Sequence, residues 1–117
     1  MLNFSLRSRT LIVTVTGDVD QHNAGSIRDG IYLKISHENV KRLVFDFSNL
    51  DFMDSSGIGI IIGRYKLMNA LGGTVAIVAV KPTLQKLLDL SGIKKIVPVF
   101  GSLQEAISTK GGVNNEQ

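Results

Sequence analysis

Runs of apolar and β-branched residues along the chain predict five strands. Residues 10–16 form one such run, and the weaker alternation of residues 3–7 predicts a partner strand that a short hairpin joins to it. Compact apolar runs predict three further strands at residues 43–47, 74–80 and 96–100. Because Pro98 cannot donate a backbone hydrogen bond, we expect the last of these strands at an edge of the sheet.

Apolar residues spaced three and four apart predict four helices, at residues 24–36, 57–71, 82–91 and 103–110. Asn23 is the expected N-cap of the first helix, and Pro82 stands at the first position of the third. Gly72-Gly73 and Gly92 follow helix ends, as C-terminal caps do. Ser102 and Glu105 form a capping box for the last helix.

The predicted order of elements is β-β-α-β-α-β-α-β-α. Strands that alternate with helices pair in parallel, whereas two strands joined by a hairpin pair antiparallel. We therefore expect an α/β fold, a mixed β-sheet with amphipathic helices packed on it. The 117 residues suffice for one domain, at residues 1–110, followed by a flexible tail at residues 111–117.

Composition excludes several classes of function. Cysteine is absent and the histidines are His22 and His37, so we expect no thiolate nucleophile, no metal site of a common type and no cofactor. The net charge of +3 is not gathered into a basic run, which argues against a nucleic-acid partner. No apolar stretch reaches about 18 residues and no export signal is recognisable, so we expect a cytoplasmic protein without a membrane partner.

The segment from residue 46 to residue 63 carries the most information about function. A predicted strand ends near Phe47 and a helix begins near Ser55. The residues between them therefore lie at the carboxyl end of a strand, where ligands gather in open α/β sheets. Asp54, Ser55 and Ser56 are all good capping residues, and capping alone is one interpretation of them.

Two features of this helix start indicate more than a cap. Gly57 and Gly59 each cost about 1 kcal/mol relative to alanine in a helix, so their bare backbone suggests that another group approaches closely. The hydroxyls of Ser55 and Ser56 lie where free N–H groups and the helix dipole favour a phosphate. Phosphorylation there adds about −1.5 to −2 charges and would change what can dock on the surface without unfolding the helix.

Residues 17–24 form a second polar loop between a strand and a helix, and therefore lie at the same type of sheet edge. Asp18 and Asp20 are candidates for an acid–base pair or a magnesium site, but a polar turn that leads to a helix cap is the favoured interpretation. A small nucleotide hydrolase that uses Asp20 and Ser55 is an alternative, although the chain has no phosphate-binding glycine motif.

Taken together, these segments resemble the anti-sigma factor antagonists, a family with the STAS fold. The resemblance extends over residues 3–108, and its motifs are Thr16-Gly17-Asp18-Val19-Asp20, Phe52-Met53-Asp54-Ser55-Ser56-Gly57-Ile58-Gly59, Gly63-Arg64-Tyr65-Lys66 and Leu87-Leu88-Asp89-Leu90-Ser91-Gly92-Ile93. The second and third motifs are typical of the branch that acts on the sporulation sigma factor sigma-F. Asp18 stands where this branch often has Glu, and Asn23 where it has His or Thr.

This resemblance implies a regulatory switch rather than an enzyme. Family members bind an anti-sigma factor that is also a serine kinase with bound nucleotide, and they displace the sigma factor that it holds. The kinase phosphorylates the serine after the Asp, here Ser55, and a serine phosphatase restores the active form. The implied partner-binding residues are Asp20, His22, Asp54, Ser55, Ser56, Gly57, Ile58 and Gly59. We expect the free protein to be a monomer, and a STAS module of a stress-signalling complex is the alternative within the family.

Overall fold

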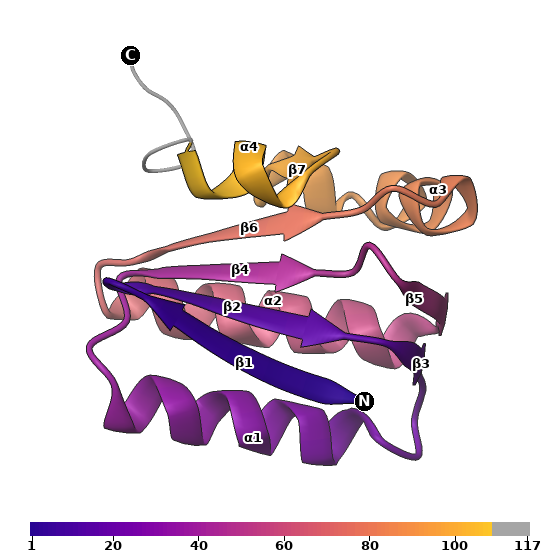
Figure 1. Ribbon diagram of the computed structural model, residues 1–117. Helices are drawn as coiled ribbons and strands as arrows, with labels where there is room; N and C mark the ends of the chain where they lie inside the picture. The colour runs from indigo at the N-terminus through magenta and orange to yellow at the C-terminus, as the bar shows by residue number, and fades with distance from the viewer. Residues whose placement is uncertain (109–117) are drawn as a thin grey trace.

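The computed structural model describes residues 1–108 and has a mixed five-stranded sheet in the order β1-β2-β4-β6-β7. β1 pairs antiparallel with β2, and the other neighbours pair in parallel (Figure 1). This confirms the predicted α/β fold, including the opening hairpin and the edge position of the strand next to Pro98. The strands are β1 (Leu2–Arg7), β2 (Thr10–Val15), β4 (Arg42–Asp46), β6 (Thr74–Val78) and β7 (Val99–Phe100).

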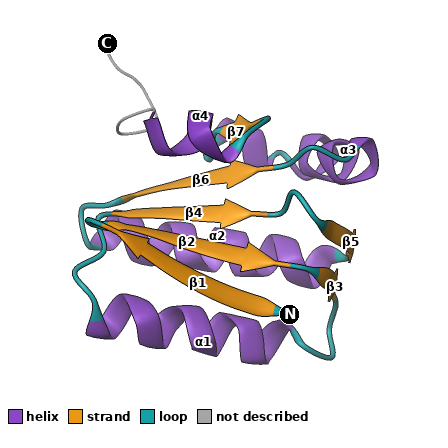
Figure 2. Cartoon of the chain, viewed as in Figure 1, coloured by secondary structure: helices purple, strands orange, loops and turns teal. Residues whose placement is uncertain are grey.

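Four α-helices connect or follow these strands, close to the predicted ranges: α1 (Ala24–His37), α2 (Ser55–Ala70), α3 (Pro82–Ser91) and α4 (Leu103–Ser108). Figure 2 shows α1 and α2 running alongside each other on one face of the sheet. The predicted ends of α2 and α3 are confirmed, since Gly72 and Gly92 both adopt the left-handed backbone with φ of +77°. Residues 109–117, including the predicted tail, lie outside the described residues.

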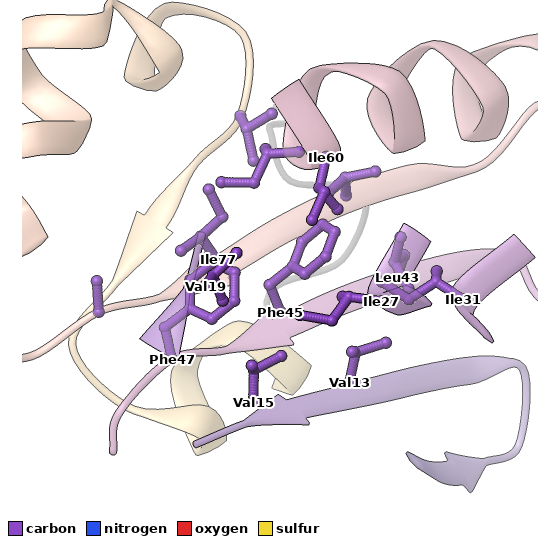
Figure 3. Packing of buried hydrophobic residues seen from close by; sticks show 14 of the residues in the cluster. Val13, Val15, Val19, Ile27, Ile31, Leu43, Phe45, Phe47, Ile60 and Ile77 are labelled. Atoms are coloured by element: carbon purple, nitrogen blue, oxygen red, sulfur yellow. The ribbon is translucent and has the colours of Figure 1, made fainter. Parts of the chain in front are cut away.

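The period of two along the strands divides the apolar residues between two sides of the sheet. Val13 and Phe45 belong to the large core on the side of α1 and α2, together with Ile31 and Ile60 of those helices (Figure 3). Ile12, Val44, Ala76 and Val78 face the other way and pack against Ala106 of α4. Two separate apolar layers therefore hold helices to both faces of the sheet.

Arg42 ties α4 to the sheet and is 7% exposed. Its Nε and Nη2 atoms donate to the carbonyl oxygen of Ala106 at 3.1 and 2.9 Å, and its Nη1 donates to the Thr74 hydroxyl at 2.9 Å. Burial lowers the pKa of the Arg42 guanidinium, because the charged form loses water. The opposite end of α4 is capped as predicted, since the Ser102 hydroxyl accepts from the Glu105 N–H at 3.2 Å.

Two short strands and one turn were not predicted. β3 (Gly17–Val19) occupies part of the predicted loop, and β5 (Leu50–Met53) lies between β4 and α2. The last strand is shorter than predicted because a 3₁₀ turn (Ile93–Lys95) precedes it. Val97 N donates to Ile93 O at 2.9 Å, and the Val97 side chain is buried in the main core. Part of the apolar run at residues 96–100 thus serves core packing and not the sheet.

Candidate functional site

The short parallel pair of β3 and β5 builds the candidate site at one end of the main sheet (Figure 1). Val19 and Met53 are partners in this pair, and the Asp54 N–H donates to the Val19 carbonyl at 3.1 Å. Asp20 and Asp54 each follow directly on a paired residue. The two polar segments singled out from the sequence therefore start side by side.

Asp54 is the residue that caps α2. Its Oδ1 accepts from the Ser56 N–H at 2.8 Å, and its carbonyl accepts from the Gly57 N–H at 3.0 Å. Ser55 occupies the first position of the helix and is exposed, whereas Ser56 is half-buried. The helix therefore does not depend on the Ser55 hydroxyl for its cap, which leaves that hydroxyl available for chemistry.

The two glycines of the first helical turns have different surroundings. A Cβ atom on Gly57 would lie 2.6 Å from the Met53 Sδ and 2.8 Å from its Cε, so the close approach predicted at this residue is made by Met53 from inside the protein. Gly57 is buried, whereas Gly59 is exposed and a Cβ there would meet no atom within 4 Å. Gly59 and the half-buried Ile58 leave an open surface beside Ser55.

Asp20 holds the neighbouring loop together. Its Oδ1 accepts from the backbone N–H groups of His22 and Asn23 at 2.9 and 3.3 Å. These hydrogen bonds form the polar turn that the sequence favours at this position. The His22 side chain is 84% exposed, and its Nδ1 lies 3.6 Å from the same Asp20 oxygen.

The predicted N-cap position of Asn23 at α1 is confirmed, but its side chain does not cap the helix. Its Oδ1 accepts from the Asp20 N–H at 3.0 Å, and its Nδ2 donates to the Asp18 carbonyl at 2.8 Å. The amide is used to close the loop that presents Asp20 and His22, because it has both a donor and an acceptor to offer.

A groove of about 200 Å³ lies next to Met53, between β5 and the start of α3. Its lining comprises Leu50, Asp51, Phe52, Met53, Thr83, Leu84 and Leu87. Lys81 Nζ and Asp51 Oδ1 form an ion pair of 3.2 Å beside it. The groove was not expected from the sequence, because the four residues of β5 do not stand out there as a strand. The available signal was Phe52, an apolar residue in the polar segment before the helix.

Within residues 1–108, no cluster of His, Asp and Glu side chains is arranged to hold a metal ion. The same part of the chain contains no helix with the length and apolarity needed to cross a bilayer.

Comparison with known proteins places the chain in a family and agrees with its fold. The model of the STAS domain family matches residues 2–106. The chain is 40% identical to the anti-sigma F factor antagonist of Paenibacillus polymyxa over 98 residues, which are 84% of each protein. The structure of the anti-sigma factor antagonist SpoIIAA in its unphosphorylated form superposes with a TM-score of 0.82 at 28% identity, covering 98% of this chain and 100% of that one. The phosphorylated form of SpoIIAA from Bacillus has a TM-score of 0.71 at 29% identity, covering 92% and 96%.

Proposed function

The chain belongs to the STAS domain family, and we propose on this basis that it is an anti-sigma factor antagonist. In its unmodified form it binds an anti-sigma factor that is also a serine kinase, and so frees the sigma factor that the kinase holds. The relative from Paenibacillus polymyxa is named as an antagonist of anti-sigma F factor, which supports sigma-F, the sporulation factor, as the one released.

The observation that carries this proposal is the position of Ser55. It is exposed at the first position of α2, and Asp54 provides the cap. A phosphoryl group can therefore be added to its hydroxyl, and removed by a phosphatase, without breaking a structural hydrogen bond. The phosphorylated form of the relative SpoIIAA supports such a modification within the family.

Phosphorylation would change binding through charge. The carboxylates of Asp18, Asp20 and Asp54 already belong to this end of the molecule, and the kinase brings the phosphates of its nucleotide to the same interface. A phosphoserine adds about −1.5 to −2 charges, with repulsion and desolvation costs against any partner group nearby. Shifting a partner from about 1:99 to 99:1 needs roughly 5.5 kcal/mol of differential binding, and these two costs act in the required direction.

The modified chain should keep its backbone conformation. The positive end of the α2 dipole favours an anion at Ser55. Asp54 opposes this gain by its charge, and it already accepts the Ser56 and Gly57 N–H groups that a phosphate would otherwise recruit. We therefore expect the free energy of unfolding to change by no more than about 1 kcal/mol, and the switch to need no second conformation.

Phosphosite mapping tests this proposal. The chain is incubated with its cognate anti-sigma F factor and ATP, and mass spectrometry should locate one phosphate on Ser55. Ser56→Ala is the matched control and should still receive its phosphate on Ser55. Ser55→Ala should remain unmodified yet still bind, because the hydroxyl takes no part in the cap. Phosphate mainly on Ser56, or no binding of the unmodified chain to the anti-sigma factor, would contradict the proposal.

A further inference from the structure

The groove between β5 and α3 presents an exposed aromatic ring that the phosphorylation switch does not explain. In β5, Leu50 and Met53 point into the core, whereas Asp51 and Phe52 remain at the surface. Phe52 is 54% exposed and lines the groove. Leaving half of a large aromatic ring in water forgoes hydrophobic stabilisation, so a contact partner for it would gain binding free energy.

The charges beside the groove are already balanced. Asp51 is paired with Lys81 at 3.2 Å, and the remaining lining residues are uncharged. An ionic ligand would therefore find no free counter-charge among the lining residues. The volume of about 200 Å³ is below the roughly 300–1,000 Å³ of typical small-molecule sites. The lack of a free charge and the small volume both suit apolar side chains from another protein.

The short distance between Phe52 and Ser55 indicates that this partner is the kinase that acts on Ser55. Phe52 precedes Ser55 by three residues, so the two Cα atoms lie at most about 10–11 Å apart. A stable protein partner buries about 800 Å² on each side, which is a disc of about 16 Å radius. A kinase that acts on Ser55 must cover the surface around it, and Phe52 falls within that disc.

We propose that Phe52 and the groove beside it receive an apolar side chain of the anti-sigma factor and anchor it next to Ser55. This inference rests on the proposed function and deepens it. The interface then has two halves: an apolar anchor on the β5 side and a polar, charge-sensitive half at Ser55, Asp20 and His22. Exposed aromatic residues that become buried near the centre of an interface are the usual carriers of affinity.

The two halves predict separable effects. Replacing Phe52 by alanine should weaken binding of the unmodified chain by about 30-fold, the size of a binding hot spot. In the kinase reaction the same change should raise the KM for this chain and leave kcat nearly unchanged, because the anchor acts on bound substrate and transition state alike. Phosphorylation should still weaken whatever binding remains.

The test measures Kd by titration calorimetry, and KM and kcat by phosphoryl transfer, with the purified cognate anti-sigma F factor and ATP. Leu71→Ala is the matched control: Leu71 is 49% exposed and follows the far end of α2, about 24 Å from Ser55 along 16 residues. It should behave like the wild type. As a second variant, Thr83→Phe fills the groove from an exposed position on α3 and should weaken binding to a similar degree.

The outcomes separate this inference from the proposed function. If the wild type binds and is phosphorylated while Phe52→Ala and Thr83→Phe match Leu71→Ala, the anchor is refuted and the switch stands. If the wild type neither binds nor is phosphorylated, the proposed function fails and the anchor fails with it. An effect of Phe52→Ala on self-association alone would assign the groove to a second copy of the chain and overturn the inference.

Discussion

The contact between Gly57 and Met53 leads to a sharp prediction about stability at the start of α2. Gly57→Ala places a Cβ atom 2.6 Å from the Met53 Sδ and 2.8 Å from its Cε. Both residues are buried, and the cavity that they share with six other core residues has a volume of about 10 Å³. That is about the space of one water molecule, so a Cβ on Gly57 must push the thioether against its core neighbours or toward the groove that Met53 also lines.

Two opposing effects determine how much Gly57→Ala changes the free energy of unfolding. Overpacking of a filled core typically costs about 1–3 kcal/mol, whereas alanine is favoured over glycine in a helix by about 1 kcal/mol. We expect Gly57→Ala to lower the free energy of unfolding by up to about 2 kcal/mol. Met53→Ala removes the obstructing atoms and by itself should cost about 2–5 kcal/mol. In that background the overpacking is absent, and Gly57→Ala should stabilise by about 1 kcal/mol.

Urea unfolding followed by circular dichroism measures all four proteins of this double-mutant cycle. The coupling free energy should be about 1–3 kcal/mol, with a change of sign for the Gly57 substitution. Gly59→Ala is the control in the same helix, because its Cβ would meet no atom within 4 Å. It should stabilise both backgrounds equally. Additive effects of Gly57→Ala and Met53→Ala, within about 0.5 kcal/mol, would refute the role assigned to Met53.

Three further predictions concern charge, burial and capping. Ser55→Asp should weaken binding to the anti-sigma factor less than phosphorylation does, because it adds one charge and no tetrahedral oxygens; an unchanged Kd in calorimetry would exclude local charge as the switch. Arg42→Met should lower the free energy of unfolding by about 1–3 kcal/mol, because the buried Ala106 carbonyl loses its donors. Hydrogen exchange should then rise first in α4, and unchanged protection there would contradict this role. Asp54→Ala should cost about 1 kcal/mol in thermal unfolding and Asp54→Asn much less, since asparagine also caps; equal losses would show that the cap is not the reason.

The order and the approximate bounds of the main strands and helices follow from local patterns in the sequence. The centres of β2, β4 and β6 are apolar runs, and such runs form strands that are buried on both faces of a sheet. The neighbours Val44 and Phe45 pack on opposite faces of β4, and both are buried. Pro82 and Gly92 place the ends of α3 by their own backbone preferences, which act within a few residues. Local preferences of this kind do not depend on what packs against them, and these predictions were confirmed.

The sequence shows where the candidate site lies, but it does not show how β3 and β5 pair to form it. Asp54 and Ser55 lie at a strand end and a helix start, which the pattern shows. Strands as short as β3 and β5, with three and four residues, carry too few positions for a recognisable period. Each of these strands is stabilised by parallel pairing with the other. That pairing depends on the twist and spacing of the whole sheet.

The roles of Gly57, Asn23 and Arg42 depend on contacts that form only in the folded protein. The sequence indicates a close approach at Gly57 but not that Met53 makes it, and it offers Asn23 as a cap although the loop competes for the same amide. Arg42 is expected in water by its charge, yet the carbonyl of Ala106, 64 residues later, holds it inside. Each outcome depends on a partner that the fold brings near, and a one-dimensional pattern does not specify such distances.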